Sequence, residues 1–189
     1  AKGQWTAFRE TAADGAEMFV PERVKASDWL KGRADPSVAV KWQPHEVWSS
    51  CDGSYAVTRG AWQRPGSAGS FVTVWQRQKD GKYKWLLDMS LADERAPAAP
   101  DMVSGKVADC GKDPVQQAAL AVDRAARQAA TAAFAASGMK DTALGGSDDA
   151  TLSWHSRTVP GSERHVSVQF WNGKGFDTVI DTRVTPRVP

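Results

Sequence analysis

The chain has 189 residues, of which 41% are hydrophobic and 24% are charged, and its formal net charge at pH 7 is +2. This composition is typical of a globular protein with enough apolar residues to form a core. Lys and Arg are interleaved with Asp and Glu along the chain, which argues against nucleic-acid binding and against an anionic membrane as partner. No apolar run approaches the roughly 20 residues that a membrane-spanning helix needs.

Two helices are expected near the N-terminus. Apolar residues recur every three or four positions from Gln4 to Glu17, which predicts a first helix that ends near Gly15. A second, shorter helix is expected from Lys25 to Lys31, with Trp29 as an anchor.

Three tight-turn signals, each Asp-Gly or Asn-Gly between strand-like runs, predict β-hairpins. They lie at Cys51–Ser54, Lys79–Lys82 and Trp171–Lys174. Short turns make neighbouring strands antiparallel. The first half therefore predicts a four-stranded meander over residues 38–50, 55–63, 70–78 and 83–89.

The turn at Lys79–Lys82 also predicts a register. A three-residue loop with a glycine bulge sets Trp75 opposite Trp85, and further along it sets Thr73 opposite Leu87 and Phe71 opposite Met89. Asp88 is then expected on the other face of the sheet, with Lys84 and Leu86.

Composition shifts to Ala, Pro, Asp and Gly at residues 93–112, which predicts a linker or a long connection. Asp113-Pro114 then opens an Ala-rich helix that runs to Ser137, and its small side chains, such as Val115 and Val122, predict close packing. Strands are expected at 151–159, 164–171 and 175–184. The order of elements predicts an α+β fold in which residues 113–189 form an antiparallel extension packed on the first half.

Cys51 and Cys110 are the only cysteines, and no Cys or His cluster has metal-ligand spacing. They are either two buried free thiols or one disulfide, and the disulfide is favoured because they are the only pair. A disulfide favours an oxidising compartment, so we expect a periplasmic or secreted protein. The chain begins without a signal-peptide pattern, as if already processed.

Motifs spread over the first half resemble a SnoaL-like domain of the nuclear transport factor two-like superfamily, and within it bacterial exported proteins of unknown function. The segments that carry the resemblance are the first helix, Trp29–Arg33, Trp42–Pro44, Ser50–Gly53, Thr58–Gly60, Phe71–Trp75 and Asp80–Trp85.

The resemblance covers residues 1–92. It implies a cone-shaped, strongly curved antiparallel sheet with helices packed in its concave face and a pocket at the wide end. Enzymes of that superfamily place Asp, His, Tyr or Arg in the cone, and this sequence matches none of their combinations residue by residue. The resemblance therefore implies an architecture and assigns no catalytic residue.

Two residues are weak catalytic candidates. Asp88 interrupts an apolar strand near its end, where an acid in an apolar pocket would have a raised pKa; the alternative is a solvated or interfacial carboxylate paired with Lys or Arg. His45 could act as a base, or could be an ordinary polar residue at a strand irregularity. Glu46 cannot form a dyad with it directly, because adjacent strand residues point to opposite faces.

Tryptophan is unusually frequent, and most of the tryptophan residues lie in expected strands. These rings either pack the sheet against the helices or line a cavity for an apolar or aromatic ligand. The candidate ligand-binding residues are Trp29, Trp42, Trp48, Trp62, Trp75 and Trp85.

The function expected is that of a non-catalytic exported domain that binds a small apolar or aromatic molecule, or mediates association, for example with a second copy of the chain. The alternative is a small lyase, isomerase or hydrolase that transfers a proton with one carboxylate or His. No cofactor motif is present, and Gly145–Asp149 offers too few ligands for a Ca²⁺ site.

Overall fold

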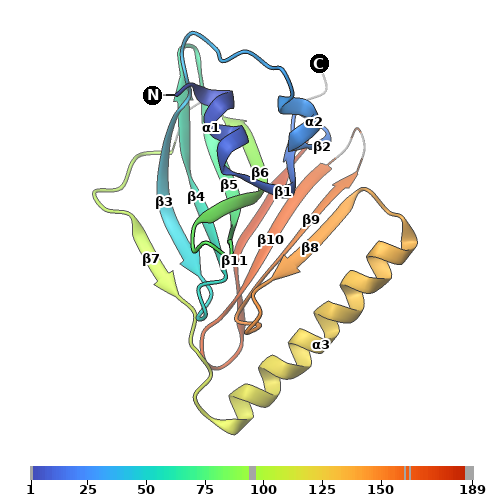
Figure 1. Cartoon of the computed structure of the whole chain (residues 1–189). Coiled ribbons are helices and arrows are strands. Elements are labelled where there is room, and N and C mark those ends of the chain that lie inside the picture. Colours follow the sequence, from blue (N-terminus) through green and yellow to red (C-terminus); the bar gives the residue numbers. More distant parts are fainter. Residues whose placement is uncertain (1, 94–96, 160, 162, 186–189) are drawn as a thin grey trace. The chain divides into compact units, whose positions relative to one another are not determined.

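The computed structural model describes residues 2–93, 97–159, 161 and 163–185 (Figure 1). The chain divides into two compact units. Unit 1 comprises Ala1–Val47 and Ala56–Gly105, and unit 2 comprises Trp48–Tyr55 and Lys106–Pro189. The chain therefore enters unit 2 twice. The predicted packing of residues 113–189 on the first half stays a prediction.

Unit 1 is built around a seven-stranded sheet in the order β2-β1-β6-β5-β4-β3-β7, of which the boundary ends of β3, β4 and β7 belong to unit 2. The pairs β1–β2 and β5–β6 are antiparallel, whereas β1 and β6 are parallel, so the sheet is mixed. The elements are α1 (Gln4–Thr11), β1 (Ala12–Phe19), β2 (Arg23–Lys25), α2 (Ala26–Leu30), β3 (Lys41–Ser49), β4 (Tyr55–Arg64), β5 (Ser67–Arg77), β6 (Tyr83–Asp93) and β7 (Ser104–Val107).

The first predicted helix is too long. It ends at Thr11, and Ala12–Phe19 forms β1 instead. Gly15 adopts a φ of 75° within this stretch, which a helix does not permit. The backbone groups of β1 find their partners on β2 and β6, so pairing within the sheet outweighs the helical spacing of the side chains.

Helices α1 and α2 pack on one face of this sheet, which we call the helix-covered face. Its core consists of Ala16, Met18, Ala26, Leu30 and Trp85, with Trp5, Phe8, Trp29 and Trp75 partly buried against it. The indole Nε1 of Trp85 donates to the backbone oxygen of Phe8 at 3.1 Å, which fixes α1 to β6.

Unit 2 contains a four-stranded antiparallel sheet in the order β11-β10-β9-β8, and one long helix. The helix is α3 (Pro114–Ser137), and the strands are β8 (Thr142–Gly146), β9 (Leu152–Val159), β10 (Glu163–Trp171) and β11 (Phe176–Val184). α3 runs alongside β8 (Figure 1). One row of the sheet is fully buried and includes Leu152, Val166, Val168 and Ile180.

The boundaries of α3 are confirmed, but the predicted packing face is wrong. Asp113 caps the helix through the Gln116 amide, and Gly138 ends it in the left-handed conformation. Val115 and Val122 are 79% and 72% exposed. The partly or fully buried positions are instead Gln116, Leu120, Asp123, Arg127, Ala130 and Phe134, which repeat at alternating intervals of four and three residues.

The predicted fold class is also wrong. Strands hold 48% of the residues and helices 21%, in one mixed sheet of seven strands and a second sheet of four, which is not a cone-shaped α+β fold. Segments expected as helix, linker or loop contribute β1, β7 and β8 to these sheets. Their strand pairing comes from neighbours distant in sequence, which local composition does not encode.

Candidate functional site

The acid Asp88 lies at the centre of the helix-covered face. On β6 its Cα is paired with Thr73 of β5 on one side and with Met18 of β1 on the other. Met18 belongs to the core under α1 and α2, and Thr73 shares its face of β5 with Trp75, which packs against the same core. Asp88 is therefore on the aromatic face of the sheet.

This placement corrects the predicted register. Trp75 does lie opposite Trp85, as expected, but the next pair is Val74 with Leu87, so Leu86 is an extra residue in β6. Thr73 then pairs with Asp88 and Val72 with Met89. A bulge of one residue moves every later side chain to the opposite face, so Asp88 joins the face of Trp75 and Trp85.

The carboxyl group of Asp88 is almost completely buried. The residue is 4% exposed, and its Oδ1 accepts a hydrogen bond from Thr73 Oγ1 at 2.8 Å. Within the described part of the chain, Oδ2 accepts no hydrogen bond. Burial raises the pKa of Asp88 to about 7, against the smaller opposing effect of the Thr73 hydrogen bond. The group can thus hold or release a proton near neutral pH.

Aromatic rings of unit 1 pack mostly against one another on this face. Trp42 stacks on Phe71 with 4.6 Å between ring centroids, and Phe8 makes edge contacts with Trp42 and Trp85. Trp75 Nε1 donates to Thr58 Oγ1 at 3.0 Å. Such packing explains the burial of these rings by core formation alone.

The six tryptophans predicted to bind ligand do not form one cluster. Trp48, which belongs to unit 2, is buried, as are Trp62 and Trp85. Trp29, Trp42 and Trp75 are partly buried, and the guanidinium of Arg33 lies 3.6 Å above the ring of Trp29. Their role in ligand binding stays a prediction.

The second catalytic candidate, His45, is partly buried on β3. Its Nε2 is buried and has no hydrogen-bond partner among the described residues. The neighbouring Glu46 is engaged elsewhere, because its carboxylate accepts hydrogen bonds from the guanidinium of Arg59. The expectation that His45 and Glu46 form no dyad agrees with this arrangement.

A hollow of about 490 Å³ in unit 1 lies between α1, β1 and α2. Ala16, Ala26 and Leu30 line it and also belong to the core of the helix-covered face, while Arg9, Asp14 and Lys31 contribute its charged groups. This volume lies within the range of small-molecule sites. A second hollow, in unit 2 beside α3, was not anticipated from the sequence.

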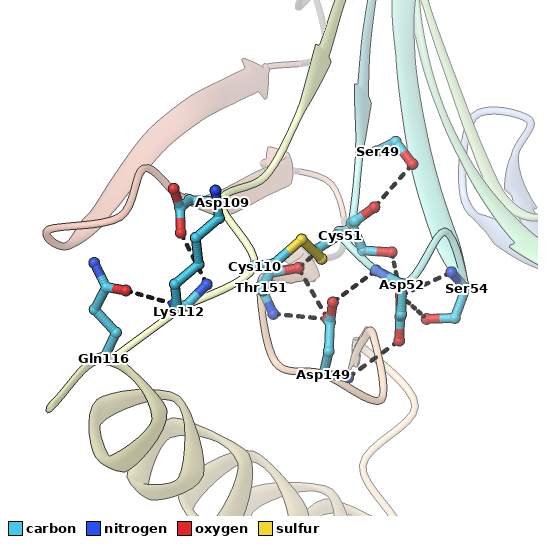
Figure 2. Close-up of a disulfide and its surroundings, with 12 residues drawn as sticks. Ser49, Cys51, Asp52, Ser54, Asp109, Cys110, Lys112, Gln116, Asp149 and Thr151 are labelled. Atoms are coloured by element: carbon cyan, nitrogen blue, oxygen red, sulfur yellow. Dashed lines mark hydrogen bonds between the residues drawn. A yellow bond between two sulfur atoms is a disulfide. The ribbon is translucent and has the colours of Figure 1, made fainter. Parts of the chain in front are cut away.

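The predicted disulfide between Cys51 and Cys110 is confirmed, with 5.2 Å between the Cα atoms (Figure 2). Both cysteines belong to unit 2. The bond joins the turn at residues 48–55 to the segment that leads into α3.

Beside the disulfide, Asp52 and Asp149 exchange hydrogen bonds (Figure 2). The amide of Asp52 donates to Asp149 Oδ2 at 2.8 Å, and the amide of Asp149 donates to Asp52 Oδ2 at 3.2 Å. Partial burial acts to raise the pKa of Asp52, but hydrogen bonds from Ser50, Ser54 and the Asp149 amide outweigh it and lower that pKa. Both carboxylates accept hydrogen bonds from the backbone of the two turns and so stabilise the turn structure.

Within residues 2–93, 97–159, 161 and 163–185, no three His, Cys, Asp or Glu side chains gather as a metal site. Over the same described residues, none of the helices has the length and hydrophobicity needed to cross a membrane. Comparison with protein-family models and with curated proteins finds no match for this chain.

Proposed function

We propose that this chain is a non-catalytic binding protein of an oxidising, extracytoplasmic compartment, and that unit 1 binds a small apolar or aromatic molecule with one hydrogen-bond donor. Asp88 is the residue that accepts from that donor. The observation that carries the proposal is the buried Asp88 carboxyl group, which has one oxygen without a hydrogen bond among the described residues and lies on an aromatic face.

Burial of a carboxyl group with a single hydrogen bond disfavours its ionised form, and groups with pKa values perturbed in this way cluster at functional sites. An apolar ligand with a hydroxyl or amine group would donate a second hydrogen bond. The hollow between α1, β1 and α2 lies beside this core, because its lining residues Ala16, Ala26 and Leu30 belong to the same core as Met18, the neighbour of Asp88. Asp88 itself does not line the hollow, so the ligand reaches it only if this core opens.

The disulfide supports the proposed compartment, because such bonds persist in oxidising environments. The resemblance of residues 1–92 to SnoaL-like domains stays a prediction, and the proposal does not depend on it.

The experiment compares two probes, 2-naphthol and 2-methoxynaphthalene, which share a ring system while only the first has a hydroxyl donor. Binding is measured by ligand-observed NMR at about pH 8, where an acid with a pKa of about 7 is mostly ionised. We expect 2-naphthol to bind about tenfold more tightly, as one hydrogen bond to a charged acceptor predicts.

The variant Asp88→Leu should abolish this preference while it retains apolar binding. Asp101→Asn is the matched control, because Asp101 is an exposed carboxylate of the same unit that does not line the hollow, and it should retain the preference. Equal binding of the two probes to the unaltered protein, or no binding of either, would refute the proposal.

One observation favours a second candidate function, proton transfer by Asp88, because its pKa of about 7 suits a general base at neutral pH. The probe is 5-nitrobenzisoxazole. A base removes its C3 proton, the N–O bond breaks, and the coloured 2-cyano-4-nitrophenolate forms with no other reactant. A catalysed rate that rises with pH around 7 and disappears in Asp88→Asn would favour this function over binding alone. A rate equal to that of buffer would leave binding as the proposed function.

A further inference from the structure

Unit 2 contains a hollow of about 680 Å³ between α3 and β8. α3 supplies its charged and polar wall through Arg124, Arg127 and Gln128, together with small apolar side chains such as Ala132. Opposite α3 are the backbone of Gly145 and Gly146 and the side chains of Leu144 and Tyr55. Its volume is that of a site for a small organic molecule.

The guanidinium of Arg127 is the most informative group in this wall. Its side chain is 18% exposed, and Nε donates to Asp123 Oδ2, one helical turn earlier, at 2.8 Å. Nη2 is buried and finds no acceptor among the residues that the structure describes. A buried N–H of a charged group without an acceptor is unfavourable, so the site would be stabilised by a ligand that supplies an acceptor oxygen.

The position of this guanidinium depends on a glycine. A Cβ at residue 146 would lie 2.0 Å from Arg127 Nη1 and 2.6 Å from the backbone oxygen of Leu152. Only glycine therefore allows Arg127 to lie against β8. Together with Asp123, Gly146 holds the guanidinium in a defined place before any ligand binds, which reduces the ordering cost of binding.

Charges around the hollow select among anions. Arg124 and Arg127 lie one turn apart on α3, while Asp148 provides a negative charge near Tyr55. Burial, followed by Asp148, raises the pKa of Tyr55, against a lowering effect of Arg127, so its phenol stays protonated at neutral pH. The hollow therefore has two arginine cations, of which Arg127 already pairs with Asp123, and one nearby anion, Asp148. This balance favours a ligand with one negative charge over a ligand with two.

We propose that this hollow is a binding site for a small organic carboxylate with an apolar body. One carboxylate oxygen accepts from the guanidinium of Arg127, and Arg124 adds a second favourable charge. The apolar body of the ligand packs against Leu144 and the alanines of α3. This site is in a different unit from Asp88, so it does not depend on the function proposed for unit 1.

The experiment uses benzoate, benzamide and inorganic phosphate as probes of the full chain. Benzamide has the ring of benzoate without its charge, and phosphate has charge without an apolar body. Binding is followed by isothermal titration calorimetry and by the Nε–Hε NMR signals of the arginines. We expect benzoate to bind, to shift the Arg127 signal, and to exceed both other probes by about tenfold.

Arg127→Gln should weaken benzoate binding about tenfold, and Arg127→Lys should weaken it less because it retains the charge. Ala132→Phe fills the hollow without a change of charge and should also abolish binding, while circular dichroism shows that α3 persists. Arg183→Gln is the matched control, since Arg183 is an exposed arginine of the same unit that does not line the hollow, and it should bind benzoate normally.

Several results would overturn the proposal: no binding of benzoate at about 10 mM, equal binding of benzamide, phosphate binding as tight as that of benzoate, or an equal loss in Arg183→Gln. Binding of 2-naphthol to unit 1 should be unchanged in Arg127→Gln. Failure of one site is therefore distinguishable from failure of the other.

Discussion

Asp88 of unit 1 is buried and Asp52 of unit 2 is partly buried, and the pKa values of their carboxyl groups shift in opposite directions. Asp88 in unit 1 has one hydrogen bond, from Thr73, and its pKa rises to about 7. Asp52 in unit 2 accepts from Ser50, Ser54 and the amide of Asp149, and its pKa falls. Stronger burial with one donor favours the protonated form of Asp88, whereas weaker burial with several donors favours the ionised form of Asp52. Asp88 is therefore free to titrate, whereas Asp52 is a fixed structural anion.

Of the changes considered, loss of the disulfide beside Asp52 in unit 2 should have the largest effect on stability. Cys51 and Cys110 are 59 residues apart, and the chain-entropy relation for such a loop gives about 4 kcal/mol. Reduction should lower the free energy of unfolding in urea by this amount. The double variant Cys51→Ser/Cys110→Ser should reproduce the loss without reductant. Unchanged stability would show that the bonds between Asp52 and Asp149 hold the turn without the disulfide.

The pH dependence of the stability of Asp88→Asn tests the role of Asp88 in unit 1. Asp88 has a folded-state pKa of about 7 against its ordinary value of 3.8, so the folded protein retains a proton that the unfolded chain releases. The stability of the unaltered protein should fall as pH rises through this range, and Asn, which does not titrate, should escape this loss.

The advantage of Asp88→Asn should grow by about 3 kcal/mol between about pH 5 and pH 8, measured by urea unfolding at each pH. Asp101→Asn, the exposed control in the same unit, should show no such trend. A constant difference between Asp88→Asn and the unaltered protein would mean that Asp88 does not titrate in this range.

Asp52→Ala should have the opposite pH dependence. Its removal leaves the amides of Ser54 and Asp149 without their acceptor, which should cost about 2 kcal/mol at neutral pH. Because the pKa of Asp52 is lowered from 3.8, its contribution is present above that value and is lost as pH falls through the folded-state pKa. The free energies of unfolding of Asp52→Ala and of the unaltered protein should therefore become similar at acidic pH. Urea unfolding at neutral and acidic pH would measure both. The neighbouring Asp148→Asn should cost little, and a comparable loss there would contradict a specific role for Asp52.

The smallest effect is expected at the start of α3. Asp113 accepts from the Gln116 amide at 2.9 Å, and the Gln116 side chain accepts in return from the Asp113 amide. Asp113→Ala should cost about 1 kcal/mol, whereas Asp113→Ser should retain most of the cap. Thermal unfolding followed by circular dichroism would rank the three proteins, and equal stability of Asp113→Ala and the unaltered protein would contradict this role.

Features with a local chemical signature could be predicted from the sequence. The Asp-Gly and Asn-Gly turns, the Asp113 cap and the disulfide each depend on a few neighbouring residues or on the only available partner. Strand β1 could not be predicted, because Ala12–Phe19 contains Gly15 and small residues with no strand alternation, and its structure comes from pairing with β6. Strand β8, which ends in two glycines, could not be predicted for the same reason.

The locations of the two candidate sites depend on features smaller than a helix or a strand. One extra residue, Leu86, decides the face on which Asp88 lies, and turn chemistry does not specify such a bulge. The hollow in unit 2 was missed because the small side chains of α3 were expected to pack closely against a sheet or another helix. The sequence signal that could have pointed to this hollow was the charged pair Asp123 and Arg127, at positions i and i+4 of an otherwise Ala-rich helix.

The short turn at residues 48–55 has a consequence for how the protein is made. This turn belongs to unit 2 but lies between the two segments of unit 1, and the partner of Cys51 follows 59 residues later. The disulfide therefore cannot form until the second segment of unit 1 and Cys110 have been synthesised. A single cut in the gene also cannot separate the two units, because each unit comprises two segments of the chain that alternate along the sequence.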